Sequence, residues 1–410
     1  MPELFTVLTP QDALRKLLDH LPTGIASEAV PILDALDRVI AESPAAPGPL
    51  PAFVRSTMDG YAVRAADTFG ASESLPAYLT VIGESPMGRV PTINIGKGQA
   101  AIIHTGGMLP PGADAVVMIE RTQVARENEI EVLRAVAAGE NVIQIGEDIQ
   151  QGEALLPIGH RLRPQDLGGL AAVGITRVCV ARRPRVAILA TGDEVVPPDA
   201  EPTPGQVRDV NTYAIAGLVG RAGGIALPRG IAPDHFDTLY RAARSALDES
   251  DALVLSAGSS VSVRDMTSDV IGKLGKPGVL VHGVSIKPGK PTILAVCNGK
   301  PVFGLPGNPV SAMVVADLFL TPTLWRIQGL AQPQAPRSIR ARLARNVAST
   351  PGREDYVQVK LVERDGEVWA EPIFGKSNLI YTLVKADGLM VVPLDANGMQ
   401  AGESVDVRLF

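Results

Sequence analysis

The sequence predicts an α/β core flanked by two β-rich regions. Between about residues 176 and 328, apolar strand-like runs alternate with segments whose apolar residues recur at helical spacing. This alternation is typical of a parallel sheet covered by helices on both faces. Before and after that stretch, short β-rich runs are separated by Gly and Pro turns, which favours a β-rich insert and a β-rich C-terminal region.

Length and composition agree with several cores. At about 150 residues per domain, a chain of 410 residues fits two or three. The formal charge of -6 and the low aromatic content, 4%, argue against nucleic acid as the main partner. We expect Cys179 and Cys297, each in an apolar run, to be buried thiols in a reducing compartment. Because the sequence shows no signal segment and no run of about 18 apolar residues, we expect a cytoplasmic protein without a membrane span.

The first predicted element is a lone amphipathic helix. Thr9 and Pro10 give it a cap and a proline in the first turn, and Leu14, Leu17 and Leu18 form an apolar stripe that needs a partner. From about 48 to 152 the runs AYLTVIGE, QAAIIHTG and DAVVMIE predict the strands of a separate β-rich module.

The α/β stretch predicts where a ligand would bind. The runs RVAILA, DALVLSAG and TILAVC are apolar enough for strands buried on both faces. Ligands of such sheets bind outside the carboxyl ends of the strands. The loops TGDE, SAGSS, KPGKP and LPGNP all follow strand-like runs, so they are the candidate ligand loops.

The C-terminal region predicts a β-hairpin and a closing strand. In VQVKLVERDGEVWAEPI, the pair Asp365-Gly366 suits a type I′ turn, and ESVDVRLF forms the last strand.

Acidic residues stand in or near three loop segments, and each has an ordinary structural explanation. Asp59 in STMDGYA is typical of a turn, Asp193 and Glu194 in ATGDEV of a helix start, and Asp265 after SAGSS of an N-cap. SAGSS also has the small residues of an oxyanion loop but lacks the lysine of a P-loop.

Basic residues stand in a rigid turn. Lys287 and Lys290 flank the Pro-Gly pair of SIKPGKP, an arrangement that suits phosphate, molybdate or another oxyanion, although solvated lysines are the plain alternative. In LPGNP, Asn308 is expected to be an N-cap and Pro309 the first helical residue.

Acidic and basic loops in one α/β region indicate a metal-assisted site. Carboxylates facing an anionic substrate repel it unless a divalent cation lies between them, which points to Mg²⁺ with oxygen ligands. The histidines show no metal-ligand spacing, and the sequence contains neither G-x-S-x-G nor G-x-G-x-x-G.

Taken together, STMDGYAVR, HTGGMLPPGADAVV, IGEDI, ATGDEV, SIKPGKP, LPGNPVSA and TPGREDY resemble, in order, the molybdopterin molybdenumtransferases of the MoeA family, which are related to the E domain of gephyrin. The resemblance implies the last step of molybdenum cofactor synthesis. Adenylylated molybdopterin and molybdate are bound, Mg²⁺ assists hydrolysis of the phosphoanhydride, and molybdenum enters the dithiolene with release of AMP.

The resemblance also implies an elongated homodimer of multidomain subunits, whose cleft lies between the α/β domain of one subunit and the insert of the other. Contacts with a molybdopterin adenylyltransferase and with recipient molybdoenzymes are the further partner expectations. The implied domains are an α/β molybdopterin-binding unit (8–28 plus 176–328), a small linking region (29–48 plus 152–175), a β-rich insert (49–151) and a C-terminal β-barrel unit (329–410).

The implied site residues fall into three groups. The catalytic set is Asp59, Thr105, Glu194, Asp234, Asp265, Lys287 and Lys290. Three of these, Asp59, Glu194 and Asp265, are the expected metal ligands. The set that binds the pterin nucleotide is Asp148, Thr191, Gly192, Asp193, Ser256, Gly258, Ser259, Pro306, Gly307, Asn308, Pro309, Arg353 and Ser377.

The chain departs from the family pattern at three places. SAGSS replaces the commoner S-G-G-V-S, IQI precedes Gly146 where some members are arginine-rich, and Gly283 stands where some carry lysine. The lost positive charge would weaken anion capture or mark a preference for another oxyanion, such as tungstate.

Two other functions stay open at this level. A non-catalytic molybdopterin-binding scaffold would keep the fold but lose the acidic set, which is present here. A molybdopterin adenylyltransferase would share the α/β unit but would not explain the insert or the β-rich C-terminal region.

Overall fold

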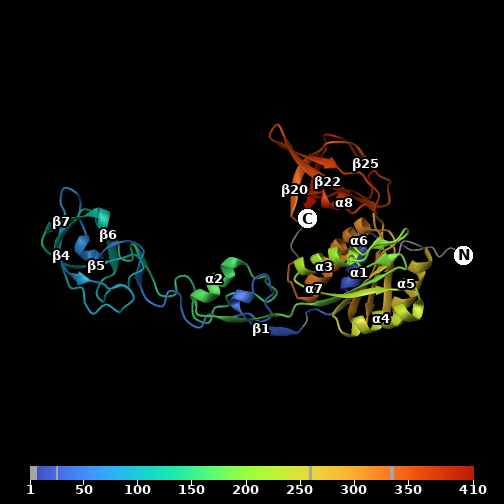
Figure 1. The fold of residues 1–410 in the computed structure, drawn as a ribbon. Coiled ribbons are helices and arrows are strands. Elements are labelled where there is room, and N and C mark those ends of the chain that lie inside the picture. Colours follow the sequence, from blue (N-terminus) through green and yellow to red (C-terminus); the bar gives the residue numbers. More distant parts are fainter. Residues whose placement is uncertain (1–6, 25, 258–260, 333–336) are drawn as a thin grey trace.

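The chain is an elongated molecule with the insert at one end and the α/β and C-terminal units at the other (Figure 1). The computed structural model describes residues 7–24, 26–257, 261–332 and 337–410. It confirms the predicted fold class, because an α/β unit, a β-rich insert and a C-terminal barrel are all present. The expected domain boundaries stay a prediction.

The α/β unit is one six-stranded sheet between two layers of helices. The sheet order is β14 (Ile225–Ala232), β11 (Arg185–Thr191), β15 (Ala252–Ala257), β19 (Lys300–Pro306), β18 (Ile293–Cys297) and β16 (Pro277–His282). One face packs against α1 (Pro10–Leu18), α3 (Asn211–Arg221), α6 (Pro309–Val315), the π-helical turn η4 (Ala316–Leu320) and α7 (Thr321–Ile327). The other face packs against α4 (Phe236–Asp248) and α5 (Val261–Leu274). The lone N-terminal helix therefore finds its predicted partner, and Thr9 accepts a hydrogen bond from the Asp12 N–H at its N-cap.

The sheet is mixed, which corrects the prediction of a parallel one. β14, β11, β15 and β19 are parallel, but TILAVC forms β18, which is antiparallel to both β19 and β16. A run buried on both faces does not reveal strand direction, since direction depends on the connection. The connection between β18 and β19 is a short turn at Asn298 and Gly299, both with positive φ.

The continuous helical run Pro309–Ile327 is long and apolar enough to cross a membrane, and it is the one such run in the described ranges. Its most apolar window is 67% buried inside the protein, as expected for a core helix.

Cys297 is buried as predicted, whereas Cys179 is only partly buried.

The linking region is built on the ladder between β1 (Ser27–Pro31) and β10 (Arg177–Ala181), with the short η1 (Ile32–Asp34) and α2 (Pro164–Ala172) against it. β10 lies within the range expected for the α/β unit, yet Val178 and Val180 pack in the linking core. Asp166 at the start of α2 accepts hydrogen bonds from Arg163 and, at 2.7 Å, from the ring of His160.

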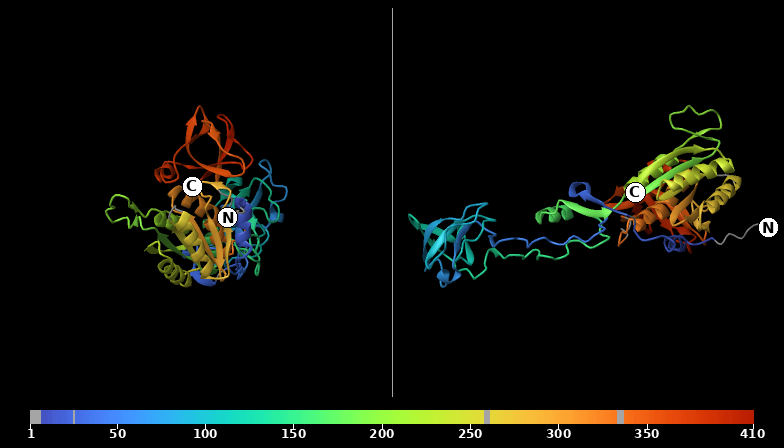
Figure 2. Two further views of the ribbon diagram at one scale, coloured as in Figure 1. Left: turned by 90° about the vertical axis from the view of Figure 1, so that its right-hand side faces the viewer. Right: turned by 90° about the horizontal axis from the view of Figure 1, so that it is seen from below.

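The insert has its own six-stranded sheet. The order is β6 (Ala115–Met118), β3 (Gly60–Val63), β5 (Gln99–Ile103), β4 (Ala77–Glu84), β8 (Glu129–Val132) and β7 (Thr122–Arg126), with η2 (Ala65–Thr68) and η3 (Ile119–Arg121) beside it. Its core is separate from those of the other units. Two chain segments run side by side between the insert and the rest of the molecule (Figure 2), joined by bridges at Ala45–Ala154 and Leu50–Ile149 and by β2 (Arg55–Ser56) with β9 (Val142–Ile143).

The C-terminal unit is a barrel with one added strand. β22 (Glu354–Arg364), β23 (Glu367–Pro372), β20 (Ser338–Leu343), β26 (Ser404–Leu409) and β24 (Gly388–Val392) close on themselves because β24 also pairs with β22. Asp365 and Gly366 both have positive φ, which confirms the predicted type of hairpin turn. The pair β21 (Val347–Ala348) and β25 (Gly398–Met399) and the short α8 (Tyr381–Val384) lie beside the barrel. The added strand, β17 (Ile286–Lys287), comes from the middle of the α/β sequence.

Candidate functional site

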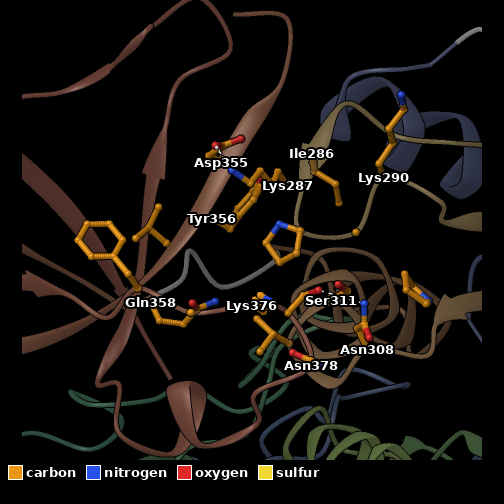
Figure 3. Close-up of a pocket in the computed structure, with 18 of the residues that line it drawn as sticks. Ile286, Lys287, Lys290, Asn308, Ser311, Asp355, Tyr356, Gln358, Lys376 and Asn378 are labelled. Carbon is orange, nitrogen blue, oxygen red and sulfur yellow. Dashed lines mark hydrogen bonds and ion pairs between the residues drawn. The ribbon is translucent and has the colours of Figure 1, made fainter. Parts of the chain in front are cut away.

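The principal cleft lies where the α/β unit meets the C-terminal unit (Figure 3), and its volume is about 860 Å³. Its walls include the KPGKP turn with Lys287 and Lys290, and the LPGNP turn from Pro306 to Asn308. The C-terminal unit adds Arg353 and Ser377 to the lining. Two of the four candidate loops therefore share one cleft with both C-terminal residues that the family resemblance implies.

Strand direction explains why these two loops meet. β16 and β19 both run toward this edge of the sheet, whereas the antiparallel β18 starts from it. KPGKP lies between the end of β16 and the start of β18, and LPGNP begins where β19 ends. The antiparallel strand thus places the lysine turn beside the proline turn.

A buried carboxylate joins the cations of the cleft. The Asp355 side chain is 6% exposed and accepts a hydrogen bond from Arg353 Nε at 2.8 Å. Lys287 Nζ lies 3.7 Å from the other Asp355 oxygen. Lys290 is exposed at the far side of the same turn, and its side chain points away from this pair (Figure 3).

Asn308 has the predicted position but not the predicted contact. It is the N-cap residue of α6 and Pro309 is at the first helical position, yet the Asn308 side chain makes no cap hydrogen bond. It donates instead to Ser377 Oγ at 3.0 Å, while the Val310 N–H donates to the Ser377 carbonyl at 3.0 Å. The expected pterin-loop residues are therefore tied to the C-terminal unit.

The acidic loops form a second group at the carboxyl ends of β11 and β14. Thr191 Oγ1 donates to Asp234 Oδ1 at 2.6 Å, and the Asp234 N–H donates to Asp193 Oδ1 at 3.1 Å. Glu194 is exposed beside Gly192, whose positive φ of 145° favours glycine and whose β-carbon would lie 2.8 Å from the Glu194 carboxylate. These hydrogen bonds hold the TGDE and APDH loops together.

Asn211 connects the carboxyl end of β15 to the cleft, and it was not among the residues predicted from the sequence. Its Nδ2 donates to Ser256 Oγ and to the Gly307 carbonyl, both at 2.8 Å. Asp265 is exposed within α5, inside the helix rather than at its N-cap. The predicted Gly258 and Ser259 lie outside the described residues.

The insert carries the remaining predicted residues. Asp59 Oδ1 accepts a hydrogen bond from the Thr105 N–H at 2.8 Å, and His104 Nδ1 lies 3.6 Å from the same oxygen. The backbone hydrogen bond from Thr105 lowers the pKa of Asp59 below its usual range, and the nearby His104 adds to that effect. His104 Nε2 is 3.2 Å from Glu84 Oε1. Asp148 is exposed on the second of the two segments that connect the insert to the rest of the molecule, where its N–H donates to the Leu50 carbonyl.

One chain does not bring all the expected metal ligands together. Asp59 belongs to the insert, whereas Glu194 and Asp265 belong to the α/β unit at the opposite end (Figure 1). No group of three or more His, Cys, Asp or Glu side chains with metal-site geometry occurs in the ranges that the structure describes.

Several cleft residues were not anticipated from the sequence. They are Ser311, Asp355, Tyr356, Gln358, Lys376 and Asn378. A signal existed for three of them, because Ser311 lies in LPGNPVSA and both Asp355 and Tyr356 lie in TPGREDY. Gln358, Lys376 and Asn378 come from segments with no distinctive motif.

An α/β sheet whose ligand edge is completed by a C-terminal barrel, with a distant β-rich insert, defines a multidomain protein whose main cleft lies between two units. Family models agree. The MoeA N-terminal region (domain I and II) matches residues 8–174, the "Probable molybdopterin binding domain" matches 187–326, and the MoeA C-terminal region (domain IV) matches 340–410.

Relatives match along nearly the whole chain. Molybdopterin molybdenumtransferase from Bacillus subtilis is 34% identical, covering 100% of this chain and 96% of its own. The protein of the same name from Nostoc is 33% identical, covering 95% and 90%. A solved MoeA structure from Pyrococcus horikoshii has a TM-score of 0.84 and 32% identity, covering 99% and 100%. The chain belongs to the MoeA family and is an enzyme of molybdenum cofactor biosynthesis.

Proposed function

We propose that the chain inserts molybdate into adenylylated molybdopterin with the help of Mg²⁺ and releases AMP. The observation that carries this proposal is the convergence of Lys287 and Arg353 on one cleft at the ligand edge of the α/β sheet. Two relatives that match along nearly the whole chain are named molybdopterin molybdenumtransferase, which supports this proposal.

The cations of the cleft fit an oxyanion. Lys287 offers up to three N–H donors, and the Arg353 guanidinium keeps donors free after its bond to Asp355. Oxyanions such as molybdate and phosphate are held by such charge-assisted hydrogen bonds. Lys290, on the far side of the same rigid turn, would meet the phosphates of the pterin nucleotide.

The acidic loops fit a Mg²⁺ ion that arrives with its substrate. Mg²⁺ commonly takes one or two carboxylates together with substrate phosphates and water, so a ready-made cage is not required. Glu194 and Asp265 are exposed acids that would hold it, with Asp59 from the insert. When bound, the ion would neutralise charge on the phosphoanhydride.

The position of Asp59 favours a homodimer. Asp59 and Thr105 lie on the insert, at the opposite end of the same chain from the cleft (Figure 1). A second copy would supply them in a site shared between subunits. Held ionised by the Thr105 N–H, the Asp59 carboxylate would orient water or metal at the bond that is hydrolysed.

The remaining expectations follow from this function. The substrate would come from a molybdopterin adenylyltransferase and the product would pass to recipient molybdoenzymes, with both exchanges in the cytoplasm. These partners and this location are proposals from the family resemblance.

The direct test adds molybdate and Mg²⁺ to protein loaded with adenylylated molybdopterin. We expect stoichiometric AMP and a product that activates a molybdenum-free recipient enzyme. Absence of both, with substrate shown to be bound, would overturn the proposal. Competition between molybdate and tungstate in the same assay identifies the preferred oxyanion.

A further inference from the structure

β17 is an α/β segment that has joined the C-terminal sheet. It lies between β16 and β18 in the chain, yet it pairs with β22 in parallel, with Ile286 opposite Glu354 and Lys287 opposite Asp355. The Glu354 N–H also donates to the Ser285 carbonyl at 2.9 Å. The backbone register therefore fixes Lys287 beside Asp355 across the boundary between the two units.

Asp355 is much more deeply buried than the cations around it. Its side chain is 6% exposed, against 59% for Lys287 and 36% for Arg353. Arg353 donates to both of its oxygens, through Nε at 2.8 Å and Nη2 at 3.5 Å, and Lys287 Nζ lies 3.7 Å from the second oxygen. Figure 3 shows Asp355 beside Lys287. The backbone conformation and the burial leave this carboxylate little freedom to move.

Two cations that must bind one anion repel each other until the anion arrives. A carboxylate between them offsets that repulsion, and its hydrogen bond restrains a long side chain before the ligand binds. An ordered donor pair loses less conformational entropy on binding than two free side chains lose.

We propose that Asp355 is a positioning residue that holds Lys287 and Arg353 in the arrangement that captures a tetrahedral oxyanion. It touches neither the oxyanion nor the pterin, and it acts through the two cations. The C-terminal unit then contributes Arg353 and its partner Asp355 to the oxyanion site. This inference rests on the proposed role of the cleft in oxyanion binding.

Removal of Asp355 changes anion affinity in one direction if Asp355 positions the cations and in the other if it acts only through its charge. Asp355 places a negative charge near the bound anion, so its removal by itself would strengthen anion binding. If Asp355 positions the cations, its removal instead weakens binding, because Lys287 and Arg353 lose their shared partner.

The experiment compares three variants of the full chain with wild type. Asp355→Asn keeps the shape and removes the charge, and Asp355→Glu keeps the charge and moves it by one methylene. Asp406→Asn is the matched control, since Asp406 lies on the same barrel, is 70% exposed and pairs with Arg340 outside the cleft. Binding of tungstate and molybdate is measured by calorimetry, with thermal unfolding recorded for each variant.

We expect Asp355→Asn to weaken oxyanion binding about tenfold, as for the loss of one charge-assisted hydrogen bond. Asp355→Glu should give a smaller loss and Asp406→Asn none. In the AMP-release assay, the KM for molybdate should rise in Asp355→Asn while kcat changes little. Unchanged or tighter oxyanion binding in Asp355→Asn would overturn the inference, as would wild-type protein that binds neither oxyanion.

Failure of the proposed function gives a different result. Wild-type protein would then bind tungstate in an Asp355-dependent way but release no AMP. If Asp355→Asn does not fold, Asp355→Glu decides, because a folded variant with wild-type affinity would equally contradict a positioning role.

Discussion

The cleft and the Asp59 site of the insert differ in how their charged groups are held. At the cleft, the exposed Lys287 and the half-buried Arg353 flank a buried carboxylate, and a strand pairing fixes the register between the two units. In the insert, the Asp59 carboxylate is 61% exposed and is held by one backbone N–H and a neighbouring imidazole.

The difference indicates a division of labour. The cleft has its donors ordered in advance, which suits binding of an anion. The Asp59 site presents an ionised acid to solvent, which suits a group that acts only when another surface covers it. We therefore expect mutations at the cleft to change affinity and mutations at the Asp59 site to change turnover.

The largest effect is expected at the Asp59 site. Asp59→Asn should lower the rate of AMP release on the order of 10²–10⁴-fold, the usual contribution of a positioned acid or base. Binding of the pterin nucleotide should be retained. Single-turnover kinetics with separately measured binding checks this, with Glu127→Gln, an exposed acid elsewhere on the insert, as control. A wild-type rate of AMP release in Asp59→Asn would contradict the assignment of Asp59 to the active site.

The second prediction tests whether the two regions are independent. Leu79 is 1% exposed in the core of the insert, so Leu79→Ala should destabilise that unit by about 3 kcal/mol. Calorimetric unfolding should show one transition shifted to lower temperature, while tungstate binding at the cleft stays as in wild type. A shift of the whole unfolding profile would show that the cores unfold together.

The third prediction concerns the cleft. Lys287→Ala should raise the KM for molybdate about tenfold with little change in kcat, because it removes one charged donor from the anion. Lys360→Ala is the control, since Lys360 is exposed on the same strand as Asp355 but does not line the cleft. A fall in kcat without a change in KM would contradict the division between the two regions.

The smallest effect is expected in the linking region between them. Burial alone would raise the pKa of Asp166, but hydrogen bonds from Arg163 and His160 outweigh it and hold that pKa well below its usual range. Because the folded pKa is lowered, this carboxylate stabilises the fold above its unfolded pKa of about 4, and the contribution is lost as pH falls toward the folded pKa.

Asp166→Asn should therefore cost about 1–2 kcal/mol at pH 7 and less as the solution is acidified. Urea unfolding at several pH values measures this difference between variant and wild type. A cost that does not depend on pH would mean that Asp166 acts through shape and not through charge.

Local patterns were enough to predict much of the fold. Thr9 caps the first helix, the apolar stripe of α4 faces the core, and the Asp365-Gly366 turn joins two strands, because each depends on residues close together in the chain. The set of loops at the ligand edge followed from the strand runs that precede them.

Contacts between distant segments could not be predicted in this way. Burial of TILAVC on both faces did not reveal its antiparallel direction, and nothing near Asn308 shows that its side chain bonds Ser377 rather than its own helix. The pairing of β17 with β22 brings Asp355 to the lysine turn. No spacing between residues in the chain predicts that contact.

The chain leaves the α/β unit toward the insert and returns from it at neighbouring residues. Ser27 lies opposite Ala181 across the β1–β10 ladder, so everything between these residues is a loop whose two ends are neighbours. Partner residues in such a ladder have Cα atoms about 5 Å apart, a gap that a short turn can close. A single short connection could therefore replace the linking region and the insert without changing the path of the chain through the α/β sheet.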